Sequence, residues 1–262
     1  MTPDTTHDTT QDLTYGMTYE WLTPSPAERV RWDVDVLYGP WPRHHRDADL
    51  AEVRARLARS PVERALALST RGALFDAESG NAATLRDLAD CPELLPVGTV
   101  DLRDAWGAEE RIEGLYAAGV RFLRLFTVEQ GAEPDFPGYR HVVDVAQTRG
   151  MVLLQDGDPR RFGPALAGRG ARVIFLDLHT YLLGDFLLLA RHEPGFMATT
   201  RLLSAPDSIE RVVGAVGAHR LVFGSRTPFT DISPQTLRLR YARIGAAERE
   251  AIAGRNVEEL LS

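Results

Sequence analysis

The chain has 262 residues, of which 44% are hydrophobic and 26% are charged, and its formal net charge at pH 7 is −7. This composition is that of an ordinary globular protein, so it excludes collagen-like, disulfide-framed and wholly disordered proteins, and the acidic balance argues against a nucleic-acid partner. All 30 basic residues are arginine, which excludes chemistry that depends on a lysine Schiff base, a lysine base or a carbamylated lysine.

The first 25 residues are rich in Thr and Asp and poor in aliphatic residues. Such a segment buries too little apolar surface to offset its ordering entropy, so we expect a tail over 1–25 that is disordered at least to about residue 11. It lacks the basic and apolar regions of a signal peptide, and either Met1 or Met17 fits as the start. No run approaches the roughly 18 apolar residues of a membrane span, and the single Cys91 fits a reducing compartment. We therefore expect a cytoplasmic protein with no membrane partner.

From residue 32 onward, short apolar runs rich in Val, Leu and Ile alternate with amphipathic stretches. The runs lie at 32–38, 64–70, 95–101, 120–126, 151–156, 172–178, 196–202 and 220–225. Several of the helix-like stretches end in a glycine such as Gly119 or Gly150, as a left-handed C-cap prefers. Buried strands separated by helices indicate a parallel sheet. Eight such units, with no G-x-G-x-x-G after the first strand, predict a single-domain α/β protein, a (β/α)8 TIM barrel over residues 26–262.

In such barrels the functional residues lie at the C-terminal ends of the strands and in the loops that follow. Here these positions form a polar ring with several arginines, which suits carboxylate or phosphate groups. The ring consists of Asp35, Tyr38, Thr70, Arg71, Asp101, Arg103, Arg124, Gln155, Asp156, Asp177, His179, Arg201, Ser225 and Arg226. The loop after the first strand adds Trp41, His44 and His45. Each of these residues also fits an ordinary loop or capping role.

Several segments resemble, in collinear order, the motifs of one known family. The C-terminal HRLVFGSRTPF and LRYARIGAAEREAIAGRNVEELLS resemble the closing strand FGSDxP and the GxNAxxLL tail of the amidohydrolase-related family. WDVDVLYGPWP lies where the family carries I-D-x-H-x-H-x-G, and LLPVGTVDLRD, AGVRFLRLF and RGMVLLQDGDP resemble its inner elements. The resemblance covers residues 32–262, and no single motif carries it. It implies the same barrel fold.

The residues that bind a divalent metal in this family are replaced here. The resemblance implies ligands from a His pair on strand one, a His on each of strands five and six, and an Asp on strand eight. These positions become Asp35 and Leu37, Gln155, Asp177 or its neighbour His179, and Arg226, while Arg124 stands where some members carry a carbamylated lysine. A leucine cannot ligate, and a permanent guanidinium repels a cation. We therefore expect no metal and no other cofactor.

Acid–base chemistry without a metal has few candidates. Asp177 and His179 are two residues apart at the end of strand six, so their side chains would point the same way as an acid–base pair. Alternatively, Asp177 caps a turn and His179 lies in the loop. Asp35 pairs with Arg226 across the mouth either as a structural salt bridge or as part of the reaction. The Asp156–Asp158 segment resembles part of a calcium loop but lacks its other acids, so we interpret it as a turn.

Two functions fit this pattern. The first is a metal-independent enzyme on an amidohydrolase-like barrel, of the hydrolase or lyase/decarboxylase type, that acts on a small anionic or carbonyl-bearing substrate. Its candidate catalytic residues are Asp177, His179, His44, His45 and Asp35. Its candidate substrate-binding residues are Arg226, Arg124, Arg201, Gln155 and Trp41. The second is a non-catalytic ligand- or partner-binding relative of the same fold; either could form a homo-oligomer, and fold alone does not choose between them.

Overall fold

A computed structural model gives the structure of the chain and describes residues 29–41 and 46–262. The expected tail over 1–25 and the candidate residues His44 and His45 lie outside the described residues. The fold and the site below are built from the described part alone.

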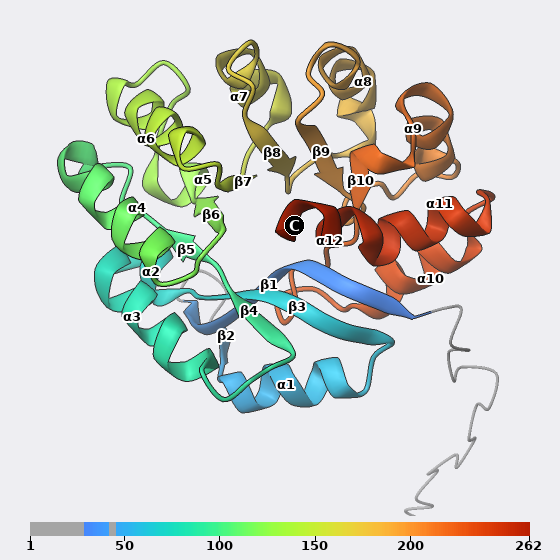
Figure 1. Cartoon of the computed structure of the whole chain (residues 1–262). Coiled ribbons are helices and arrows are strands. Elements are labelled where there is room, and N and C mark those ends of the chain that lie inside the picture. The colour runs from blue at the N-terminus through green and yellow to red at the C-terminus, as the bar shows by residue number, and fades with distance from the viewer. Residues whose placement is uncertain (1–28, 42–45) are drawn as a thin grey trace, which may run out of the picture.

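Strands form at all eight positions that the apolar runs predict, and helices cover the outside of the ring they make (Figure 1). The strands are β1 (Val30–Trp41), β3 (Val62–Ser69), β4 (Leu94–Pro96) with β5 (Gly98–Thr99), β6 (Phe122–Leu125), β7 (Val152–Gln155), β8 (Arg172–Phe175), β9 (Phe196–Thr199) and β10 (Leu221–Val222). A short β2 (Arg46–Ala48) pairs antiparallel with the end of β1, and the other pairs are parallel. The chain is therefore an α/β protein with the (β/α)8 barrel architecture.

The strand ladder is divided into two sheets rather than closed as one. The first has the order β2-β1-β3-β4 and the second β10-β9-β8-β7-β6-β5. On one side only Val97 separates β4 from β5, so a single barrel strand is interrupted there. On the other side, backbone N–H groups of β1 donate to the segment that follows β10, from Val34 to Phe223 at 3.0 Å and from Leu37 to Thr227 at 2.9 Å. We call this junction between the first and last strands the seam.

The helices begin and end where local chemistry satisfies their free backbone groups. The side chain of Asp49 accepts the Glu52 N–H at the start of the first helix, and Gly119 and Gly150 follow helices with φ of +90° and +67°, as predicted for left-handed caps. The helices are α1 (Leu50–Ala58), α2 (Arg71–Leu74), α3 (Ala77–Leu88), α4 (Ala108–Ala117), α5 (Thr127–Gln130), α6 (Pro137–Thr148), α7 (Pro159–Leu166), α8 (Leu183–His192), α9 (Ser208–Val216), α10 (Ser233–Tyr241), α11 (Ala246–Glu250) and α12 (Asn256–Leu261). Shorter turns are η4 (Ala105–Gly107), η5 (Thr180–Leu182), η6 (Ala218–Arg220) and the π-turn η7 (Ala251–Arg255). Among the described residues, every helix is too short or too polar to cross a membrane.

Alternation along the strands separates an inner from an outer apolar core. Trp32, Phe122, Ile174 and Val222 belong to the inner cluster, whereas their strand neighbours pack outward against the helices. The C-terminal α12 lies across the centre of the ring in Figure 1, and its Val257 belongs to the same inner cluster as Trp32. Trp32 lies near the N-terminal end of β1, so α12 covers the N-terminal end of the barrel. The opposite, C-terminal end carries the polar residues.

Candidate functional site

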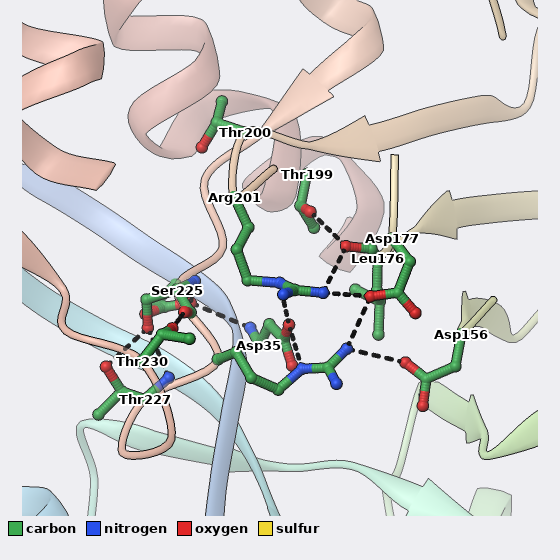
Figure 2. Close-up of polar contacts among 12 residues, drawn as sticks. Asp35, Asp156, Leu176, Asp177, Thr199, Thr200, Arg201, Ser225, Thr227 and Thr230 are labelled. Atoms are coloured by element: carbon green, nitrogen blue, oxygen red, sulfur yellow. Dashed lines mark hydrogen bonds and ion pairs between the residues drawn. The ribbon is translucent and has the colours of Figure 1, made fainter. Parts of the chain in front are cut away.

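Six charged side chains, each from a different strand or from the segment that directly follows it, meet at the C-terminal end of the barrel. We call them the arginine–aspartate cluster, and they are Asp35, Arg124, Asp156, Asp177, Arg201 and Arg226. Figure 2 shows Asp35, Asp156, Asp177 and Arg201 pointing toward one another. Three guanidinium groups and three carboxylates therefore share one site.

An irregularity in β1 positions Asp35. The pairing of β1 with β3 shifts by one residue between Asp33 and Val36, as in a β-bulge, which re-aims the side chains on that strand. The carboxylate of Asp33 supports the bend, because its Oδ1 accepts the N–H groups of Asp35 and Ser225, each at 3.0 Å. Asp35 is fully buried and its Oδ1 accepts from Arg124 Nη1 at 2.7 Å. Leu37, the other position of the expected metal-binding pair, lies in the inner apolar cluster.

Arg226 connects all three carboxylates. Its Nε donates to Asp35 Oδ2 at 3.0 Å, and its Nη2 donates to Asp156 Oδ1 at 3.0 Å and to Asp177 Oδ1 at 3.3 Å. The backbone of Arg226 is in the left-handed region with φ +63°, which is uncommon for a residue with a side chain. Strained backbone of this kind persists where the surrounding contacts over-determine it, and here three ion pairs do so.

The other two arginines complete the network. Arg124 lies on β6, is 1% exposed, and donates from Nη2 to Asp156 Oδ1 at 2.9 Å. Arg201, beyond β9, donates to Asp177 and to the carbonyl of Leu176, and its Nε lies 3.5 Å from Asp35 Oδ2. The second oxygen of Asp177 accepts the N–H of Gly157 at 2.8 Å. Each carboxylate therefore has at least two donors.

Burial and neighbouring charges set the protonation of these groups. Burial alone would raise the pKa of Asp35, but the guanidinium groups of Arg226, Arg124 and Arg201 hold it well below its usual range. Burial raises the pKa of Asp156 to about 6, against the opposing effect of Arg124 and Arg226. The pKa of Arg226 lies above its ordinary value because three carboxylates outweigh the cost of its burial. The pKa of Asp156 therefore lies closer to neutral pH than the ordinary value of an aspartate.

Gln155 was expected at the mouth, and the structure corrects this expectation. Its amide points to the outer side of β7, where it accepts from the Tyr139 hydroxyl at 2.8 Å and donates to Thr127 Oγ1 at 3.2 Å. Val152 and Leu154 belong to the inner cluster, so the next residue on the inward side is Asp156. The residue that reaches the site after β7 is therefore Asp156, which was predicted in the polar ring but was interpreted as part of a turn rather than as a catalytic or binding residue. The alternation of β7 would have identified it.

The expected pairing of Asp177 with His179 along a strand is also wrong. β8 ends at Phe175, so both residues lie beyond it and strand alternation does not relate them. Asp177 is held by Arg201, Arg226 and Gly157, whereas the ring of His179 stacks on Tyr181 with the centroids 4.9 Å apart. The alternative loop interpretation describes His179 better.

Two further expectations concern the loop after β1. Trp41 ends that strand and is buried, with its ring centroid 5.3 Å from that of Phe229. This contact places the indole against the loop that follows β10. His44 and His45, which the sequence places in the same loop, lie outside the described residues. Of the predicted site residues, the structure therefore brings together Asp35, Asp177 and the three arginines.

The donor set does not fit a divalent metal. A catalytic zinc needs at least three protein ligands and an open position, and cationic side chains must stay away from them. Each of Asp35, Asp156 and Asp177 is paired with a guanidinium group, and the second oxygen of Asp177 accepts a backbone N–H. No group of three His, Cys, Asp or Glu residues in the described part of the chain is arranged to hold a metal ion. The arginines themselves take the place that a cation would need.

Comparisons with known proteins bear on the fold. No family model and no curated protein sequence matches the chain. Among solved structures, 5-carboxyvanillate decarboxylase from Sphingomonas paucimobilis is similar at 14% identity, with 88% of this chain and 99% of that chain covered and a TM-score of 0.70. 2,6-Dihydroxybenzoate decarboxylase from Rhizobium is also similar, at 14% identity, with 89% of this chain and 98% of that chain covered and a TM-score of 0.69. This chain shares its barrel fold with both proteins.

A third similar structure holds a metal and an anionic ligand. It is 5-carboxyvanillate decarboxylase from Novosphingobium aromaticivorans, complexed with manganese and 4-hydroxy-3-methoxy-5-nitrobenzoic acid. It is 13% identical, with 91% of this chain and 97% of that chain covered and a TM-score of 0.70. At such low sequence identity, the structural similarity establishes the shared fold alone, and the chemistry of the site follows only from this chain's own residues.

Proposed function

We propose that the chain is a member of the amidohydrolase-related family that acts without a metal on a small anionic substrate, in a lyase- or hydrolase-type reaction driven by acid–base chemistry. The collinear motifs and the barrel fold support the membership. The observation that carries the chemistry is that Arg226, which is the hub of the cluster, keeps 16% of its side chain exposed beside Asp177, which keeps 23%. These two groups form the part of the cluster that a substrate can reach.

The arrangement suits a carboxylate substrate. A decarboxylation breaks a carbon–carbon bond, releases carbon dioxide and puts a proton on the carbon that keeps the electron pair. Such a site must hold an anion and supply a proton. Arg226 can hold the anion, and Asp177 faces it as the candidate catalytic residue. Asp156 shares the Arg226 guanidinium with Asp177, and its pKa is about 6. It can therefore hold the proton in the buried part of the cluster, next to the residues that contact the substrate. Asp35 is too deeply buried to touch substrate and is a positioning residue.

A second candidate function has an observation of its own in its favour. Every carboxylate of the cluster is already paired, as in a structural salt-bridge network, which suits a barrel that binds a ligand without transforming it. This candidate keeps the same contact residues and removes the proton transfer.

One experiment separates the two. The chelator-treated protein is incubated with hydroxybenzoates and with aliphatic carboxylates, product is followed by chromatography, and binding is measured by calorimetry. Turnover that survives chelation and falls in Asp177→Asn supports the enzyme. Binding with no turnover favours the ligand-binding barrel, and the absence of both refutes the two candidates together.

A further inference from the structure

The arginine–aspartate cluster is balanced in charge and largely buried. It holds three arginines and three aspartates, so it is neutral when all six groups are ionised. Only the Arg226–Asp177 edge is substantially exposed, and Asp35, Arg124 and Asp156 are at most 1% exposed. An anion that binds at this edge brings a fourth negative charge into a site with three positive ones. In a buried environment, uncompensated charge is costly.

Asp156 is the group best placed to remove that excess. The charged groups that face it are Arg124 from β6, Arg226 from beyond β10, Asp177 from beyond β8 and Glu129 from α5. The arginines favour its ionised form, whereas burial and the two acids disfavour it. It also shares Arg226 Nη2 with Asp177, so an anion that draws this guanidinium toward itself weakens the contact that keeps Asp156 ionised.

We propose that an anion bound at the Arg226–Asp177 edge is taken up together with one proton, which goes to the carboxylate of Asp156. The only covalent change is the new O–H bond on Asp156, and the proton comes from solvent. This inference rests on the proposed function, because it needs a carboxylate ligand at that edge, and it adds that the affinity of the site is set by pH.

The coupling has a defined sign. Over the pH range in which Asp156 is ionised before the anion binds and protonated afterwards, each increase of one pH unit weakens the affinity for the anion about tenfold. The free carboxyl has a pKa of about 6, so affinity changes little below that value and falls as the pH rises above it. By reciprocity, the bound anion raises the pKa of Asp156.

The test uses the full chain, with benzoate and acetate as probes. Calorimetry gives the dissociation constant at intervals from pH 5 to pH 8.5, and a potentiometric titration in unbuffered solution at pH 7 counts the protons taken up for each anion bound. We expect uptake that approaches about one proton and a dissociation constant that rises about tenfold per unit above pH 6. Asp156→Asn keeps the size and shape of the side chain but cannot be ionised, so it should bind the probe with neither proton uptake nor pH dependence.

Asp158→Asn is the matched control. This residue lies two positions along the chain, caps α7 and pairs with Arg160 outside the cluster, so its variant should keep the proton uptake of the original chain. If benzoate or acetate binds without proton uptake, the inference is overturned and the proposed anion site stands. If neither probe binds at any pH, the proposed anion site fails and the inference fails with it. If Asp156→Asn does not fold, the proton count and the pH dependence of the unmodified chain still decide.

Discussion

Replacing Arg226 by alanine should destabilise the protein substantially. The side chain makes three ion pairs, with Asp35, Asp156 and Asp177, and removing one partner of a buried pair typically costs about 3–5 kcal/mol. Here each carboxylate keeps another donor, from Arg124, from Arg201 or from a backbone N–H. We therefore expect the low end of that range, about 3 kcal/mol, or a fall in Tm of roughly 6–12 °C for a domain of this size.

A second variant separates ion pairing from backbone strain. Arg226→Gly removes the same side chain but relieves the left-handed backbone at φ +63°, which costs a residue with a side chain about 1 kcal/mol relative to glycine. The glycine variant should thus be about 1 kcal/mol more stable than the alanine variant and still less stable than the original chain. The measurement is urea unfolding followed by tryptophan fluorescence and circular dichroism.

The control is Arg103→Ala, which breaks an exposed pair with Asp101. Pairs of this kind contribute about 0–1 kcal/mol, so its midpoint should barely move. A loss in Arg226→Ala no larger than that of the control would refute the view that Arg226 is the hub of a buried network.

Three further outcomes follow from the same site. Burial raises the pKa of Asp33 to about 7, so its contribution to the free energy of unfolding is full below about pH 4 and is lost as the pH rises to 7. Urea unfolding across this range should show that decline, and Asp33→Asn should reduce the decline by an amount on the order of 1–4 kcal/mol. Asp177→Asn should lower kcat by about 10²–10⁴-fold. His179→Asn should leave kcat within about tenfold, because the His179 ring stacks on Tyr181 and not on the cluster. If steady-state kinetics instead shows the large loss for His179→Asn and the small one for Asp177→Asn, this assignment is wrong. Elemental analysis should find substoichiometric zinc, manganese and iron, and a full equivalent that chelation removes together with activity would contradict the donor-set argument.

Periodicity was sufficient to predict the fold, because burial of a parallel sheet leaves a strong pattern. All eight strand positions were confirmed, with observed strands shorter than the apolar runs at most positions, since the runs continue into buried loop residues such as Leu176 and Leu178. The alternation within one strand was informative too. Applied to β7, it places Leu154 and Asp156 inward and Gln155 outward, which is what the structure shows.

Two features of the site leave no pattern along the chain. The pairing of Asp177 with His179 failed because alternation ends with the strand, and β8 stops two residues before Asp177. The left-handed backbone of Arg226 is imposed by contacts with residues far away in the sequence, and an arginine gives no local signal of it. The part that Asp156 plays in the cluster also left no signal in the local composition, because its segment has the composition of a turn. Charge balance depends on three-dimensional neighbours rather than on spacing.

The seam between the first and last strands has a consequence for the rates at which the protein folds, unfolds and is degraded. The ion pair between Asp35 and Arg226 joins residues 191 positions apart, so it forms only after the final strand has been synthesised and has docked. Contacts of such long range are slow to close and tend to form after the rate-limiting step. A late contact mainly governs the rate of unfolding. We therefore expect loss of Arg226 to raise the rates of unfolding and proteolytic degradation and to leave the refolding rate unchanged. The cluster thus sets how long the native state persists before it unfolds.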